Sequence, residues 1–113
     1  MQILRFLLPT VILGASTVFA VEPTGTAHTY LDKCSRCHGD TGSGDTPLGK
    51  KLHCKDYSSK QAQALFTDDE ALKLIRDGKV FGEKHTMPSY KDDLSEAEQR
   101  ELLAYLRSLA KHP

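Results

Sequence analysis

The sequence is 113 residues long, which is enough for one domain. Fifteen Lys and Arg residues balance fifteen Asp and Glu residues, and the zero formal net charge argues against a nucleic-acid-binding or membrane-surface protein. Charged residues make up 27% of the chain and tryptophan is absent, so the polypeptide can build only a thin hydrophobic core by itself.

Residues 1–20 have the pattern of a secretory signal peptide. Arg5 stands near the front, and an apolar run follows from Phe6 to Ala20 and ends in a pattern of small residues typical of a cleavage site. We therefore predict cleavage after Ala20, export to the periplasm, and a single domain over residues 21–113.

An uncleaved membrane anchor is the alternative interpretation of this run. The run has about fifteen residues and is interrupted by Pro9 and Gly14, whereas a membrane-spanning helix needs about 20 apolar residues. A polar stretch begins at Glu22, which favours cleavage. We therefore expect no stable membrane insertion once the signal is removed.

The first predicted helix covers residues 24–39 and contains the sequence Cys-Ser-Arg-Cys-His at positions 34–38. Two cysteines three positions apart can each bond one vinyl group of a haem, and the histidine that follows can ligate its iron. Cys34, Cys37 and His38 are therefore candidate cofactor-binding residues.

Two other interpretations of the cysteine pair have less support. A thioredoxin-like redox motif requires a βαβ setting, and no strand-rich segment surrounds this one. A zinc site requires two further ligands, which His53 and Cys54 can supply. Adjacent residues point in different directions, however, and structural zinc ligands are usually spaced by about two to four residues.

Residues 39–49 form a turn-rich loop by composition. We expect this loop to wrap the histidine side of a bound haem, with a carbonyl near Pro47 accepting the Nδ1 hydrogen of His38. Such a bond would fix the tautomer of a ligating histidine.

Cys54 is the cysteine that haem attachment leaves over. An odd cysteine in an exported protein indicates an intermolecular disulfide or a free thiol, so a Cys54-linked dimer is one expectation. If Cys54 faces solvent, His53 and Lys55 can lower the pKa of its thiol. If Cys54 is buried, it serves as a small hydrophobic residue beside Leu52.

Three further helices are predicted, each opened by a capping box in which Ser or Thr is followed three residues later by Glu or Gln. The boxes begin at Ser58, Thr67 and Ser95, and Gly78 ends the second helix. The second and third of these helices have apolar residues at helical spacing. These residues are Ala71, Leu72, Leu74 and Ile75, then Leu102, Leu103, Leu106 and Ala110, with Tyr105 expected to meet Tyr30.

Residues 79–91 show no periodicity and contain Met87 followed by Pro88. Proline biases the residue before it toward extended geometry, so we predict that Met87 lies in an irregular loop. A thioether is a soft ligand suited to haem iron, and a Met/His pair raises its reduction potential. Met87 is therefore a candidate metal ligand together with His38. A hydrophobic plug is the other role for Met87, and His85 is the competing ligand.

The sequence resembles the class I cytochromes c, which are small, single-haem proteins. The resemblance rests on positions 34–39, the preceding export signal, the Met87-Pro88 pair and the amphipathic C-terminal helix, and it extends from about Thr24 to Lys111. It implies an all-α domain of three to five short helices, with long loops around one covalently bound haem c.

The resemblance further implies a periplasmic one-electron carrier that exchanges electrons with redox partner proteins. Cys34 and Cys37 would attach the haem, and His38 and Met87 would ligate its iron. Because both axial positions are then filled by protein, we expect no enzymatic activity. The alternative is a haem enzyme or gas sensor in which a small ligand displaces Met87.

Overall fold

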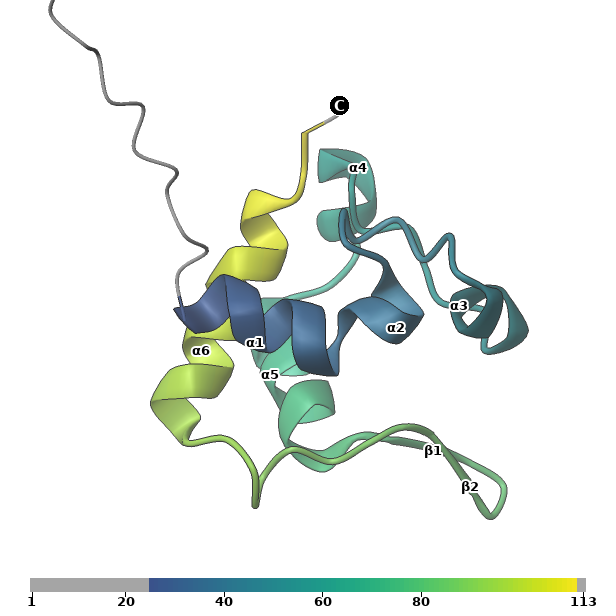
Figure 1. Ribbon diagram of the computed structural model, residues 1–113, viewed down its shortest axis with the longest axis vertical. Helices are drawn as coiled ribbons and strands as arrows, with labels where there is room; N and C mark the ends of the chain where they lie inside the picture. Colours follow the sequence, from purple (N-terminus) through teal and green to yellow (C-terminus); the bar gives the residue numbers. More distant parts are fainter. Residues whose placement is uncertain (1–24, 112–113) are drawn as a thin grey trace, which may run out of the picture.

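The computed structural model describes residues 25–111, so the predicted signal peptide and its cleavage site lie outside the described residues. The described chain is mostly helical, with six short helices and one two-stranded sheet (Figure 1). The elements are α1 Gly25–Lys33, α2 Ser35–His38, α3 Pro47–Lys51, α4 Lys60–Gln63, α5 Asp68–Asp77, β1 Lys79–Phe81, β2 Lys84–Met87 and α6 Glu96–Ser108. The predicted helical class is confirmed. The described chain has six helices where three to five were expected, and the two-stranded sheet was not predicted.

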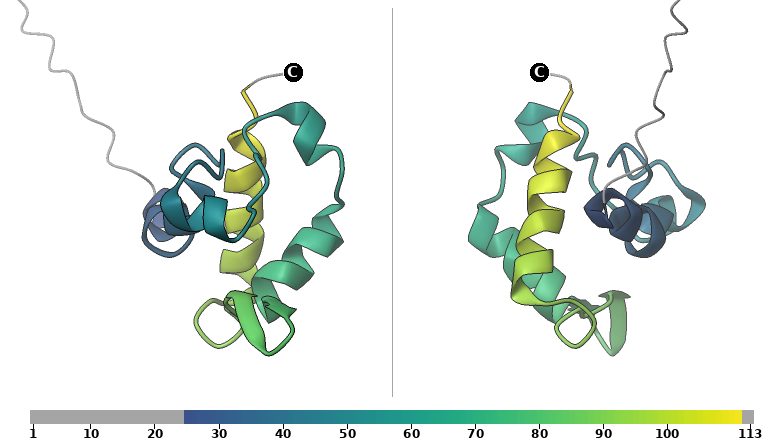
Figure 2. Two further views of the ribbon diagram at one scale, coloured as in Figure 1. Left: turned by 90° about the vertical axis from the view of Figure 1, so that its right-hand side faces the viewer. Right: turned by 60° about the vertical axis from the view of Figure 1, so that its left-hand side comes forward.

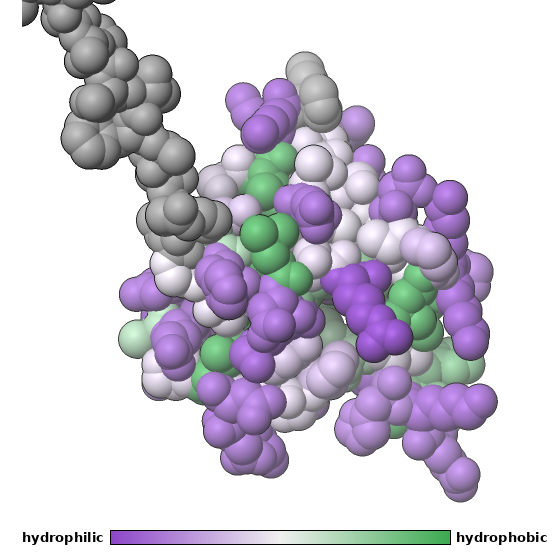
Figure 3. Space-filling model, in the orientation of Figure 1, coloured by the Kyte–Doolittle hydropathy of each residue, from purple (hydrophilic) through white to green (hydrophobic). Residues whose placement is uncertain are grey.

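Helix α6 lies between α1 on one side and α5 on the other (Figure 2). The rings of Tyr30 on α1 and Tyr105 on α6 are 5.0 Å apart between centroids, so the predicted contact across the helix crossing is confirmed. Tyr30 joins the buried leucines Leu94, Leu102 and Leu109 in the core cluster. The face shown in Figure 3 is largely hydrophilic with small apolar patches, as expected for a chain with a thin core.

Two of the predicted capping boxes open helices at the expected residues. The Thr67 hydroxyl accepts a hydrogen bond from the N–H of Glu70, and the Glu70 carboxylate accepts one from the N–H of Thr67. Ser95 and Glu98 make the same reciprocal pair at the start of α6. The predicted Ser58 box is not formed. Ser59 caps α4 instead by accepting the N–H of Ala62, whose side chain cannot complete a box.

The helix predicted over residues 24–39 is instead two helices that meet at Cys34. The N–H of Cys34 still donates to the carbonyl of Tyr30 at 2.8 Å, and the N–H of His38 donates to the carbonyl of Cys34 at 3.0 Å. The break therefore reorients the chain at the first cysteine while most backbone hydrogen bonding continues.

The irregular loop predicted around Met87 is wrong, because residues 79–87 form a β-hairpin. Phe81 pairs with Lys84 across a two-residue turn, and Gly82 takes the first turn position with φ +63°. Met87 is the last residue of β2. No helix within residues 25–111 is long and apolar enough to cross a membrane.

Candidate haem-binding site

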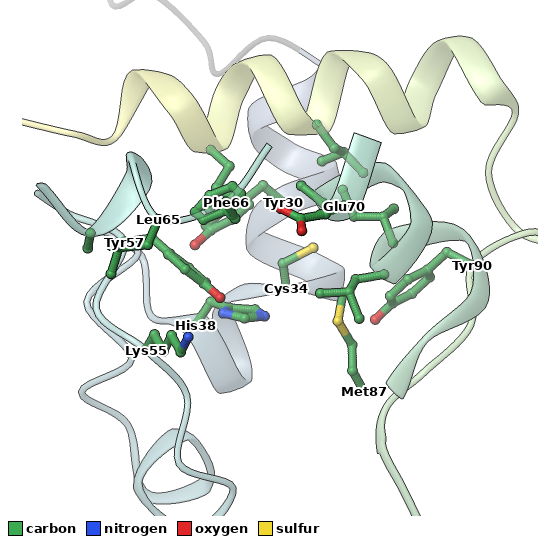
Figure 4. Close-up of a pocket in the computed structure, with 16 residues that line it drawn as sticks. Tyr30, Cys34, His38, Lys55, Tyr57, Leu65, Phe66, Glu70, Met87 and Tyr90 are labelled. Atoms are coloured by element: carbon green, nitrogen blue, oxygen red, sulfur yellow. The ribbon is translucent and has the colours of Figure 1, made fainter. Parts of the chain in front are cut away.

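A cavity opens between α1 and α2 on one side and α5 on the other, with α6 running along its upper edge in the view of Figure 4. Its solvent-accessible volume is about 170 Å³. Most of its surface is apolar, while Lys55 and Glu70 contribute charged groups. The lining residues are Tyr30, Cys34, His38, Lys55, Tyr57, Ala62, Leu65, Phe66, Glu70, Ala71, Leu74, Ile75, Met87, Tyr90, Leu102 and Leu106.

His38 ends α2 and its imidazole points into this cavity (Figure 4). Its Nδ1 is buried and has no hydrogen-bond partner among the described residues. Burial lowers the pKa of His38, so the imidazole is neutral at pH 7. A neutral imidazole in an apolar cavity is the form that can ligate a metal.

The predicted bond from His38 Nδ1 to a carbonyl near Pro47 is not formed. Pro47 is the first residue of helix α3. Thr46, rather than Pro47, ties the loop to α2. Its hydroxyl lies 2.8 Å from the carbonyl oxygen of Arg36 and 3.1 Å from that of Cys37, and it accepts the N–H of Gly49. Thr46 therefore fixes the end of the helix that carries His38.

The glycine at position 49 allows α3 to approach α2 closely. A Cβ on Gly49 would collide with the carbonyl oxygens of Cys37 and Gly44. The close approach holds the backbone of the second cysteine against α3, and no residue larger than glycine fits there without a shift.

The two cysteines of the motif are both half-buried, but only Cys34 is among the residues that line the cavity. All three cysteines of the described chain are unpaired. Burial raises the pKa of the Cys34 thiol to about 11, so this group is protonated at neutral pH.

Met87 reaches the cavity from the side opposite His38 (Figure 4). It is half-buried at the end of β2, whereas His85, the competing candidate, is exposed and is not among the lining residues. The structure therefore brings Cys34, His38 and Met87 to one cavity.

Residues that the sequence analysis did not single out form another wall of the cavity. Tyr57 lies against His38 with 5.7 Å between ring centroids, and Phe66 lies 5.3 Å from Tyr57. The guanidinium of Arg107 sits 4.3 Å from the centre of the Phe66 ring and pairs with Asp68 at 2.8 Å. Tyr57 and Phe66 are aromatic residues in an otherwise polar part of the sequence, and this pattern could have indicated that they line the cavity.

Cys54 is half-buried outside the cavity. Burial raises the pKa of its thiol, aided by the nearby Cys37, while Lys79 acts in the opposite direction. The lowering of this pKa by His53 and Lys55 was expected only for a Cys54 that faces solvent. In the half-buried Cys54, desolvation outweighs the nearby positive charge. Within residues 25–111, no three or more His, Cys, Asp or Glu side chains gather as a metal site, so the zinc interpretation gains no support.

The cavity fits a haem by its chemistry. Its walls are apolar, a neutral histidine with a partnerless buried nitrogen faces a thioether, and a thiol lies on the wall. Fold and cavity together define a small helical haem protein. The family model for cytochrome c matches residues 24–110, and the chain belongs to the cytochrome c family.

Solved structures similar to this chain include two of a c-type cytochrome. The structure titled KustC0563 c-type cytochrome is 28% identical with a TM-score of 0.67, covering 76% of this chain and 98% of that chain. A tyrosine-to-phenylalanine mutant of Kustc0563 is 25% identical with a TM-score of 0.63, covering 74% and 96%. No curated protein matches. Membership of the family makes this chain a haem electron carrier with covalently bound haem c.

Proposed function

We propose that this protein is a periplasmic one-electron carrier in which Cys34 and Cys37 hold the haem and His38 and Met87 are its axial ligands. The observation that carries this proposal is the placement of His38 and Met87 on opposite sides of one apolar cavity (Figure 4). A flat macrocycle between them would contact apolar side chains of α5 and α6, including Leu74 and Leu102.

Attachment uses the two cysteine thiols. Cys34 and Cys37 would hold the haem through two thioether bonds. Addition of each S–H across one vinyl group would form a C–S bond and place the hydrogen on the neighbouring vinyl carbon. No atom leaves, and the mass of the product is the sum of the chain and the haem. Cys34 and Cys37 lie at the ends of one helical turn, with the N–H of Cys37 donating to the carbonyl of Cys34 at 3.2 Å.

The protein's residues control the electronic properties of the site. The bound haem supplies one-electron exchange between ferric and ferrous iron. His38 offers a neutral imidazole, and Met87 offers a soft sulfur that favours a raised reduction potential. If His38 and Met87 both ligate the iron, no axial position would remain for a substrate, as expected for a carrier rather than an enzyme.

Export is proposed on the sequence of residues 1–20, since that segment lies outside the described structure. Covalent haem attachment takes place outside the cytoplasm in bacteria, as implied by the cytochrome resemblance, so the motif and the signal support each other. We propose redox proteins as partners and no nucleic acid, in keeping with the zero net charge of the chain.

A carbon monoxide titration of the reduced protein tests the carrier function. A carrier with Met87 on the iron should bind carbon monoxide slowly and weakly, because the thioether must first leave. The matched comparison is Met87→Ala, which should bind it rapidly. Rapid, tight binding by the unaltered protein would instead indicate the gas-sensing or enzymatic alternative.

A further inference from the structure

The segment that carries Met87 is held against the end of α5 by unusually close backbone contact. Gly78 ends α5 with φ +74° and donates its N–H to the carbonyl of Leu74 at 2.8 Å. A Cβ on Gly78 would collide with the carbonyl oxygen of Met87. It would also lie 2.8 Å from the carbonyl carbon of Pro88 and the nitrogen of Ser89.

The residues after Met87 donate hydrogen bonds to the carbonyls at the C-terminal end of α5. The Ser89 hydroxyl donates to the carbonyl of Arg76 at 2.7 Å, and the N–H of Lys91 donates to the same carbonyl at 3.1 Å. The N–H of Tyr90 donates to the carbonyl of Ile75 at 3.1 Å. A helix end leaves its last carbonyls without intrahelical partners, so these bonds complete α5 and position residues 89–91 together.

The same segment is also tied to the cysteine motif. The Tyr90 hydroxyl donates to the carbonyl of Lys33, the residue before Cys34, at 2.9 Å. On its other side, Met87 pairs with Lys79, which directly follows Gly78. Met87 is therefore bounded by the hairpin before it and by bonds to α5 and α1 after it.

We propose that Gly78, with the hydrogen bonds of residues 89–91 to α5, is a positioning device that holds Met87 in place as a ligand. We call this set the α5 clamp. The inference rests on the proposed ligation by Met87. A side chain at position 78 pushes the Met87 backbone away from α5, and the sulfur then loses its fixed distance to the opposite histidine.

The principal test compares Gly78→Ala with Gly82→Ala in the ferric holoprotein. Both glycines have positive φ, so both variants carry a backbone cost for an added Cβ. Only Gly78 has neighbours, since a Cβ on Gly82 meets nothing within 4 Å. Stopped-flow binding of imidazole and the weak long-wavelength absorption band of sulfur ligation are the two readouts.

Gly78→Ala should raise the rate of imidazole binding by about tenfold and weaken the sulfur band, because backbone strain is relieved by moving Met87. Gly82→Ala should leave both readouts unchanged. Equal behaviour of the two variants would overturn the clamp.

Ser89→Ala provides a milder variant if Gly78→Ala yields no folded protein. It removes one hydroxyl-to-carbonyl bond and should raise the imidazole rate by about threefold. The control is Ser108→Ala, which removes a similar bond, from Ser108 to the carbonyl of Tyr105, at the end of α6. A rate for Ser89→Ala that matches the Ser108→Ala rate would contradict the clamp.

Met87→Ala separates failure of the clamp from failure of the proposed ligation. Suppose that Met87→Ala loses the sulfur band while Gly78→Ala and Ser89→Ala behave like their controls. That result would contradict the clamp and leave the proposed ligation by Met87 intact. An intact band in Met87→Ala would remove the ligation and the clamp with it.

Discussion

The hydroxyl of Tyr30 donates a 2.9 Å hydrogen bond to the carbonyl oxygen of Gly39, the residue directly after His38. Tyr30 is almost completely buried on α1, and Gly39 has φ +77° at the end of α2. One side chain therefore connects the core to the point where the chain leaves the candidate iron ligand. The bond limits how far His38 can move away from the cavity.

Tyr30→Phe should lower the free energy of unfolding by about 1 to 3 kcal/mol, because a buried carbonyl loses its partner while the ring remains. Tyr105→Phe is the matched control, since the Tyr105 ring lies beside Tyr30 and its hydroxyl makes no hydrogen bond among the described residues. The control should change stability by less than about 0.5 kcal/mol. Denaturant unfolding of both holoproteins measures the difference, and equal losses would contradict this role for the hydroxyl.

Met87→Ala should lower the reduction potential and remove the weak ferric absorption band of sulfur ligation, because the iron loses a soft ligand. Potentiometric titration with absorption spectra measures both effects. His85→Ala is the control, since His85 is exposed on β2 and lies outside the cavity. If the spectrum changes in His85→Ala and not in Met87→Ala, the sixth ligand is His85.

Sequence patterns predicted the parts of this fold that depend on local chemistry. The boxes at Thr67 and Ser95 predicted the starts of α5 and α6, because the Ser or Thr and the Glu satisfy each other's backbone groups within one turn. The grouping of Cys34 with His38 followed from their spacing of four residues within one motif. The expectation that Tyr30 meets Tyr105 came from the cytochrome c resemblance, which implies a close crossing of two helices, rather than from a local sequence pattern.

The parts that were missed depend on pairing or on tertiary contact. The hairpin was missed because its exposed residues show no alternation between buried and exposed positions, and its pairing is set at the Gly82 turn. Helix α3 was missed within a turn-rich loop, although Thr46 before Pro47 is an N-cap followed by proline at the first helical position. Tyr57 was missed because it lies far from His38 in the sequence, and the two rings meet only in the folded chain.

Cys54 should react slowly with a thiol reagent in the native protein and rapidly after denaturation. Its half-burial limits access, and its raised pKa leaves little thiolate at neutral pH. Labelling followed by mass analysis measures the rates, with Cys54→Ser as the blank. On a non-reducing gel we expect a monomer. A dimer band that disappears in Cys54→Ser would instead establish an intermolecular disulfide.

The Glu98 cap should make part of the stability depend on pH. The hydrogen bonds that Glu98 accepts at Ser95, chiefly from the backbone N–H, lower the pKa of Glu98 below its usual value of 4.5. The charged carboxylate therefore stabilises the fold above about pH 4.5, and this contribution is lost as the pH falls through the folded-state pKa. Glu98→Gln keeps an acceptor but cannot ionise. Urea unfolding should give a higher free energy of unfolding for the unaltered protein than for Glu98→Gln at neutral pH, and this difference should disappear in acid. A difference that does not change with pH would contradict the role of the Glu98 carboxylate.

Covalent attachment at Cys34 and Cys37 is the central claim, and the intact mass of the denatured protein tests it most directly. The exported protein should have the mass of the chain without residues 1–20 plus one haem, with no atom lost. Cys34→Ala and Cys37→Ala should each keep at most one thioether bond, and the double variant should show the chain mass alone, while Cys54→Ser keeps the haem. Haem that remains on the denatured double variant, or its absence from the unaltered protein, would contradict the account.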